Sequence, residues 1–465
     1  MRPPVTSNWY SWMCSQYGYY FDWLDGTDGK HVMPPDFVKA MPKEDYCSEG
    51  YWKKVQANET WSVYGFDIDY CLSEKLSDQC SLNVTVSLLM VVIAFNFVKV
   101  VVISMTLFTV KDKPLITIGD AVASFIRERD TTTEGMCLLT KEDVIQRTRT
   151  QTKDSRGPFS LFKKRPALRG SFQLLSPKPF KPSNPRGFHA ASRARWLTTS
   201  ILTLTALLAL LGLLTYALIT LQRDASLGNL PSIWSLGLHT TSPHTLITHW
   251  SLPLTGRAAT TPAILVSNTP QALLTLLTLH FNALLTALSA AREHAAHASR
   301  PRTLRVAGAP PTAAQRSTYF LQLPYRLGAP AAVLAVLAHW CLSQALFVAK
   351  IDGADARGLP RRDWAFSIMT CGYSPLALVL AAGVVAVGWA AVVALGARRV
   401  RAGGMPVAGC CSVVVAAACQ GPEGTGEGRG LMWGVVEGVG GGDGVGRCAL
   451  QNGVVGRPVE GRLYA

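Results

Sequence analysis

The stretch from Leu197 to Leu221 reads LTTSILTLTALLALLGLLTYALITL, and no charge interrupts it between Arg195 and Arg223. At about 1.5 Å of rise per residue, a helix of this length crosses a hydrocarbon core of roughly 30 Å with some tilt. A helix satisfies its backbone hydrogen bonds within one segment, as a single apolar stretch in lipid must. The stretch therefore predicts a transmembrane helix, and the rest of the chain is placed relative to it.

The composition of the whole chain agrees with a membrane protein. Of the 465 residues, 48% are hydrophobic, and 45 Lys and Arg stand against 30 Asp and Glu. The excess of basic residues is uneven: residues 1–83 hold 7 basic and 12 acidic residues, whereas residues 111–196 hold 18 basic and 8 acidic. This asymmetry favours a membrane protein that obeys the positive-inside rule, and we expect the lipid bilayer rather than nucleic acid as its partner.

Four further apolar stretches predict an all-α transmembrane protein, a polytopic helix bundle of about five spans. The predicted spans are 84–110, 197–221, 262–291, 328–349 and 376–397. The acidic or nearly neutral segments 1–83, 222–261 and 350–375 are expected outside, and the basic segments 111–196, 292–327 and 398–465 in the cytoplasm. The N-terminus is then extracellular or lumenal and the C-terminus cytoplasmic.

The acidic N-terminal region has the features of an extracellular segment. It holds two N-glycosylation patterns, at Asn58 and Asn83. Asn83 lies too close to the first span, so Asn58 is the better candidate. The first 30 residues contain no apolar segment of a signal peptide. We therefore expect a further membrane segment upstream, with unaided translocation of a long tail as the alternative, and a place in the plasma membrane or secretory pathway. Four cysteines are candidates for two disulfides whose pairing the sequence leaves open: Cys14, Cys47, Cys71 and Cys80.

The cytoplasmic linker and tail are expected to be largely disordered. Residues 116–126 suggest a short amphipathic helix along the membrane surface, but from Lys141 to Arg195 the linker is basic, contains proline and has no sustained apolar period. Its cations are expected to lie near anionic lipid headgroups. Residues 420–447 are mostly glycine, which recovers little folding entropy through buried side chains.

Polar side chains inside the predicted spans are the candidate functional groups, because such groups are costly at membrane depth. They are Asn96, Lys99, His280, Asn282, His339 and Gln344. A transporter or channel that uses Lys99, His280 and His339 is one hypothesis; interhelical hydrogen bonding is the alternative reading of the same residues. We expect no cofactor and no metal, since the single histidine pair of His280 and His339 is weak evidence for a haem site. No catalytic motif is present, so we expect no enzyme activity.

Several short motifs resemble those of a known family. They are PLITIGDA (114–121), NTPQ (268–271), QRSTYFLQLPYR (315–326), CGYSP (371–375) and the terminal LYA (463–465). The chain resembles fungal multipass membrane proteins that carry a domain of unknown function, a likeness that implies membrane insertion but no activity. The leading hypothesis is thus a multipass integral membrane protein with a scaffold or sensor role at the cell surface, whose protein partners the sequence does not name.

Overall fold

The computed structural model describes residues 62–63, 66–67, 86–111, 115–146, 176–225, 229–238, 245–247, 257–307, 315–319, 322–352, 367–426, 429–436 and 444–465. The chain divides into two compact units. The smaller comprises Met1–Ile93, Thr241–Ile264 and Val348–Gly372; the larger, called the main unit here, comprises Ala94–Thr240, Leu265–Phe347 and Tyr373–Ala465.

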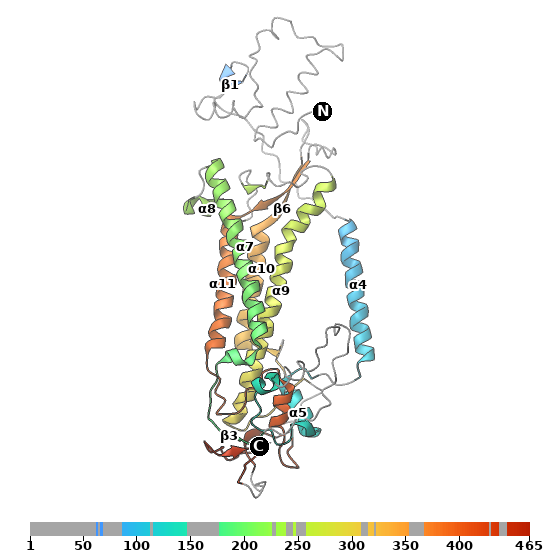
Figure 1. Ribbon diagram of the computed structural model, residues 1–465. Helices are drawn as coiled ribbons and strands as arrows, with labels where there is room; N and C mark the ends of the chain where they lie inside the picture. The colour runs from blue at the N-terminus through green and yellow to red at the C-terminus, as the bar shows by residue number, and fades with distance from the viewer. Residues whose placement is uncertain are drawn as a thin grey trace, which may run out of the picture. The chain divides into compact units, whose positions relative to one another are not determined.

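The predicted class of helical membrane protein is confirmed, because five described helices are long and apolar enough to cross a membrane. They are α4 (Val86–Thr109), α7 (Arg193–Ala225), α9 (Arg257–Ala295), α10 (Tyr325–Ala345) and α11 (Pro375–Ala397) (Figure 1). Helix α9 has 39 residues, so it is about 58 Å long, nearly twice the roughly 30 Å of a hydrocarbon core. The helix is therefore longer than a single membrane crossing needs.

Helix α11 is the central packing element of the main unit, because it contacts both α7 and α10. Its Trp389 ring lies 6.2 Å from the Trp196 ring of α7 and is stacked 5.8 Å from the Phe281 ring of α9. Aromatic pairs of this kind contribute about 0.5–1.5 kcal/mol beyond their buried area. This cluster holds α7, α9 and α11 together at the level of Trp389.

The fourth span ends earlier than its apolar run. Residues 328–349 were predicted to be helical throughout, but α10 ends at Ala345 and the strand β6 (Leu346–Asp352) follows, paired with β7 (Ser367–Tyr373). Hydrophobicity alone does not separate a helix from a buried strand over so few residues. The backbone groups that follow Ala345 find partners across the hairpin instead of along the helix. Ser374 then caps α11 through a hydrogen bond from Ala377 N to its Oγ.

A second folded layer, called the juxtamembrane body here, is built from the described residues of 115–146, 176–192, 296–307 and 398–465. Its elements are α5 (Ile118–Arg127), η1 (Thr131–Thr133), β3 (Lys178–Pro179), η3 (Gly187–Ala190), η5 (Ala296–Ala298), β4 (Arg305–Val306), α12 (Ser412–Ala418), β8 (Leu431–Val435), β9 (Cys448–Asn452) and β10 (Leu463–Tyr464). Val122, Phe180, Leu304, Trp433 and Tyr464 are buried in one hydrophobic cluster. The body thus gathers parts of the chain that are far apart in sequence around one core, as the neighbouring α5, β3 and C-terminus of Figure 1 also show.

The prediction of a disordered linker and tail is wrong for the described residues of both segments. The expected helix near 116–126 exists as α5, and its apolar face packs into the core of the body through Val122 and Ala123. In the tail, β8 pairs with β9, and Leu431 and Leu450 are both fully buried. The glycine content of the tail predicts disorder, because glycine recovers little folding entropy through buried side chains. The apolar residues between the glycines nevertheless form short strands, which pack against the linker.

Other predictions fall on residues outside the described part of the chain. These are the glycosylation site Asn58, the four cysteines Cys14, Cys47, Cys71 and Cys80, and linker residues 147–175. Within the N-terminal region, the structure describes only a short antiparallel pairing of β1 (Ser62–Val63) with β2 (Phe66–Asp67).

Candidate functional site

The N-terminus of α5 is fastened to a loop nearly 190 residues away. Thr117 and Asp120 form a reciprocal capping box, with Asp120 N donating to Thr117 Oγ1 and Thr117 N donating to Asp120 Oδ2. The same two side chains also reach β4: Thr117 Oγ1 donates to Arg305 O at 2.7 Å, and Asp120 Oδ1 accepts from Ala307 N at 2.9 Å. We call this set of contacts the α5–β4 junction.

Arg305 connects the junction to the start of α10. Its guanidinium lies 3.8 Å from the centre of the Tyr319 ring and donates to Ser317 O and to Tyr319 Oη. It also lies 3.3 Å from the Glu293 carboxylate at the end of α9. Cation–π and charge-assisted bonds of this kind are strongest when partly buried. The quoted motifs 114–121 and 315–326 therefore meet through Arg305, and their first role is structural.

A basic surface lies where α7 begins and α11 ends. Residues 176–196 contain five Lys and Arg and no Asp or Glu, and backbone bonds tie this segment to the chain after α11. Val400 N donates to Pro185 O at 2.8 Å, and Gly187 N donates to Arg398 O at 3.0 Å. The arginines that this arrangement gathers are Arg186, Arg193, Arg195, Arg398, Arg399 and Arg401, which we call the basic collar; all but the half-buried Arg195 are exposed.

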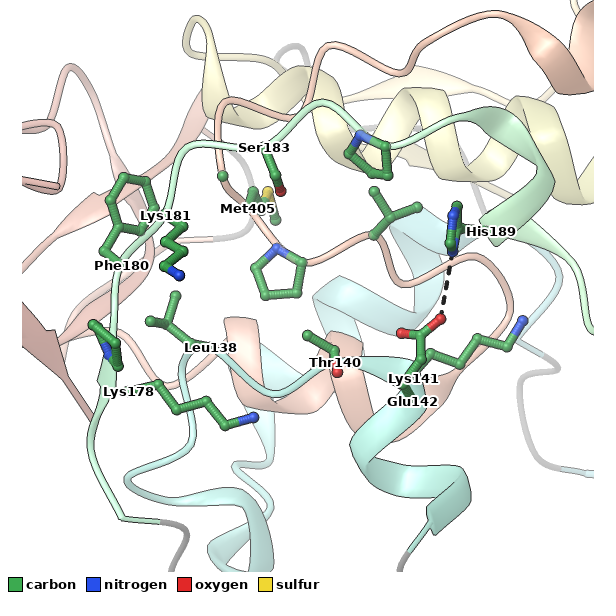
Figure 2. A pocket seen from close by; sticks show the side chains of 15 residues that line it. Leu138, Thr140, Lys141, Glu142, Lys178, Phe180, Lys181, Ser183, His189 and Met405 are labelled. Carbon is green, nitrogen blue, oxygen red and sulfur yellow. Dashed lines mark hydrogen bonds and ion pairs between the residues drawn. The ribbon is translucent and has the colours of Figure 1, made fainter. Parts of the chain in front are cut away.

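A pocket of about 300 Å³ adjoins the basic collar within the body. Its walls come from residues 138–142, 178–189 and 404–407. Figure 2 shows Lys178 and Lys181 on one side of it and Lys141 with Glu142 on the other. Gly404, which has a positive φ of 89°, lets the chain pass directly against the Phe180 ring, where a side chain would collide. The pocket is therefore shaped by the fold of the tail against the linker.

The charges around the pocket are only partly paired. Lys178 Nζ donates to Asp143 Oδ2 at 2.7 Å, and His189 Nδ1 lies 3.5 Å from Glu142 Oε1. Among the described residues, no acceptor lies within hydrogen-bond distance of the Lys181 ammonium, which is exposed. Lys181 is thus a free cation on the wall of a pocket that has room for a small ligand.

The pairing of Lys178 is maintained over a wide pH range. Burial raises the pKa of the Asp143 carboxyl, but hydrogen bonds from Lys178 and Thr140 outweigh it, so the pKa lies below its usual value. A carboxyl whose pKa is depressed in the folded state contributes stability above its unfolded pKa and loses it as the pH falls through the folded one. Lys178 therefore stays paired at neutral pH, whereas Lys181 is available.

The structure does not bring the six candidate polar residues of the spans together. Asn96 and Lys99 lie on α4, none of whose residues is buried. His280 Nδ1 lies 2.9 Å from Leu276 O of its own helix, and Gln344 Nε2 donates to Ser343 Oγ. Asn282 and His339 lie on α9 and α10. In the described part of the chain, no hydrogen bond or ion pair joins any two of the six, and no group of three or more potential metal-ligating side chains occurs.

Cys137 and Cys448 belong to no motif of the sequence, and the fold buries them side by side in the core of the body. A hydrogen bond with Cys448 lowers the pKa of the Cys137 thiol, and the same bond together with burial raises that of Cys448. Their separation in sequence leaves no spacing that predicts the contact. The Thr-x-x-Asp pattern at 117–120, in contrast, is a capping-box signal visible in sequence.

Comparison with known proteins supports one part of the family resemblance, the domain of unknown function. The model of one protein family, described as a domain of unknown function (DUF8419), matches residues 117–445. The match begins at the capping residue of α5 and includes α7, α9, α10 and α11. No curated protein and no solved structure matches the chain.

Proposed function

We propose that this chain, which belongs to the family with the domain of unknown function DUF8419, is a membrane scaffold or sensor. Its juxtamembrane body binds anionic lipid headgroups, a role that we propose from the geometry of the chain itself. The observation that carries the proposal is the basic collar together with the free ammonium of Lys181 in the adjoining pocket. The proposed role is binding rather than catalysis.

The position of these cations supports a headgroup ligand. Arg193 is the first residue of α7, and Arg398 follows the last residue of α11, so both flank segments that are apolar enough to span a membrane. Cations at this depth attract anionic lipid, at about 1 kcal/mol for each Lys or Arg near the surface. Their chemistry fits a phosphorylated headgroup, which also accepts several hydrogen bonds from Lys and Arg.

Loss of two of these cations is expected to weaken headgroup binding. At about 1 kcal/mol for each cation, the double substitution Lys181→Ala with Arg186→Ala should lower affinity about 30-fold. The measurement is fluorescence polarisation of labelled dioctanoyl phosphatidylinositol bisphosphate with the full chain in neutral detergent, at low and high salt. The wild-type affinity should fall with salt, since exposed charges are screened.

The matched control is Arg457→Ala, which removes an exposed arginine of the same body that neither lines the pocket nor belongs to the collar. It should retain nearly the wild-type affinity. Equal affinities for all three proteins, or equal binding of dioctanoyl phosphatidylcholine, would refute the headgroup proposal.

We further propose that the N-terminus lies outside and the C-terminus in the cytoplasm. The basic collar supports this orientation, because Lys and Arg next to membrane spans favour the cytoplasmic side. Sequons introduced singly into a chain without its natural sequons test it in microsomes. A sequon within 241–244, which is well separated from the start of α9, should be glycosylated, and one within 150–170 should not; the reverse pattern would overturn the orientation.

A further inference from the structure

An apolar groove of about 340 Å³ runs between α9, α10 and α11 in the main unit. Of its 23 lining residues, only Thr278, Asn282 and Arg326 are polar. On α10 the lining includes Ala331, Ala335 and other small residues, which leave the space between the helices unfilled. A volume of this size is in the range of cavities that hold organic ligands.

One end of the groove carries a free cation. Arg326 lies in the first turn of α10, where the helix dipole adds a partial positive charge. Its side chain is exposed, and among the described residues no acceptor lies within hydrogen-bond distance of its guanidinium. The preceding Tyr325 ring packs edge-on at 5.9 Å against Tyr319, the residue on which Arg305 stacks. The N-terminal end of α10, where Arg326 lies, therefore adjoins the α5–β4 junction.

The length of the groove matches one leaflet of a bilayer. Its lining on α10 extends from Arg326 to Ala338, which is about 18 Å along a helix axis. Half of a roughly 30 Å hydrocarbon core is about 15 Å. A chain that enters beside Arg326 therefore reaches close to the bilayer midplane at Ala338.

We propose that this groove binds one acyl chain of an anionic phospholipid, whose net negative headgroup pairs with Arg326. An acyl chain suits the almost wholly apolar walls, and a negative headgroup complements the single free cation at the groove end. The site is separate from the basic collar and its pocket, and it requires only that α9, α10 and α11 lie in the membrane.

Native mass spectrometry of the full chain, released from vesicles with equal amounts of phosphatidylserine and phosphatidylcholine, tests this site. The wild type should retain one phosphatidylserine in preference to phosphatidylcholine. Arg326→Gln alters an exposed side chain and should lower that preference about fivefold, the effect of about 1 kcal/mol for one cation. Ala335→Phe should fill the groove and abolish retention of either lipid.

The neighbouring substitution Val336→Phe is the control, because Val336 is exposed on the same helix and does not line the groove. It should leave retention unchanged. A wild type that retains no phospholipid, an Arg326→Gln variant with unchanged preference, or equal losses in the two phenylalanine variants would each overturn the proposal. The Lys181→Ala and Arg186→Ala double variant should keep the groove lipid, which separates this site from the proposed headgroup site of the body.

Discussion

Replacing Gly119 by alanine is expected to open the juxtamembrane body, at a cost of about 3 kcal/mol, the upper part of the usual range for overpacking. Gly119 is buried in the first turn of α5, and an added methyl group would overlap the backbone carbonyl of Arg305. Relief of that overlap requires α5 to move away from β4. Such a movement breaks the bonds of Thr117 to Arg305 O and of Asp120 to Ala307 N.

The measurement for Gly119→Ala is alkylation of the buried cysteines under native conditions, resolved by peptide mass spectrometry. Cys137, Cys419 and Cys448 are at most 3% exposed, so a maleimide should modify them slowly in the wild type and quickly in the variant. Burial also raises the pKa of Cys419 to about 12, and the thiol becomes reactive only when it is released.

The matched control is Gly212→Ala in α7, where nothing lies within 4 Å of an added methyl group. Alanine is the better helix former, so this change should be neutral or slightly stabilising. If Gly119→Ala left the three cysteines as protected as Gly212→Ala does, the α5–β4 junction would not hold the body closed.

Replacing Tyr464 by alanine is expected to destabilise the body by about 3–5 kcal/mol, as large aromatic truncations in cores do. The Tyr464 ring is 1% exposed and packs edge-on at 6.1 Å against Phe180. Its hydroxyl accepts a hydrogen bond from Val459 N at 2.9 Å. Because β10 pairs with β3, loss of this ring should also release Lys178 and Lys181 and weaken headgroup binding.

The adjacent Leu463 provides the comparison for Tyr464. It is 44% exposed, so Leu463→Ala should cost within about 0.5 kcal/mol. The measurement is the thermal unfolding of both variants in detergent, monitored by alkylation of Cys448. The unfolding temperatures rank the two variants by stability. Equal unfolding temperatures would show that the C-terminal strand is not part of the core.

The two halves of the α5–β4 junction show how far sequence reasoning reaches toward the site. Thr117 and Asp120 are recognisable as a local cap, because a capping box depends on residues three apart. Their partner Arg305 is 188 residues from Thr117, and no local pattern predicts such a contact. The sequence predicts only part of the basic collar. It shows the excess of basic residues in the linker, but it does not predict that they lie beside Arg398 and Arg399.

The tail shows why an average composition misleads. Its glycines suggested disorder, yet Trp433 and Leu450 are at most 2% exposed. Gly434 is needed where the chain passes directly against Gly456. Composition sums over a window, whereas burial depends on which few apolar residues meet partners elsewhere in the chain.

The sequence by itself determined that this protein has long apolar helices of membrane-spanning length, because a span must be predominantly apolar over about 20 consecutive residues and its backbone must bond within the segment. Only the tertiary structure decided that linker and tail form one body, that the collar arginines share a surface, and that an apolar groove ends at Arg326. Those features arise from contacts between residues far apart in the chain. The local hydrophobic period of a sequence does not predict such contacts.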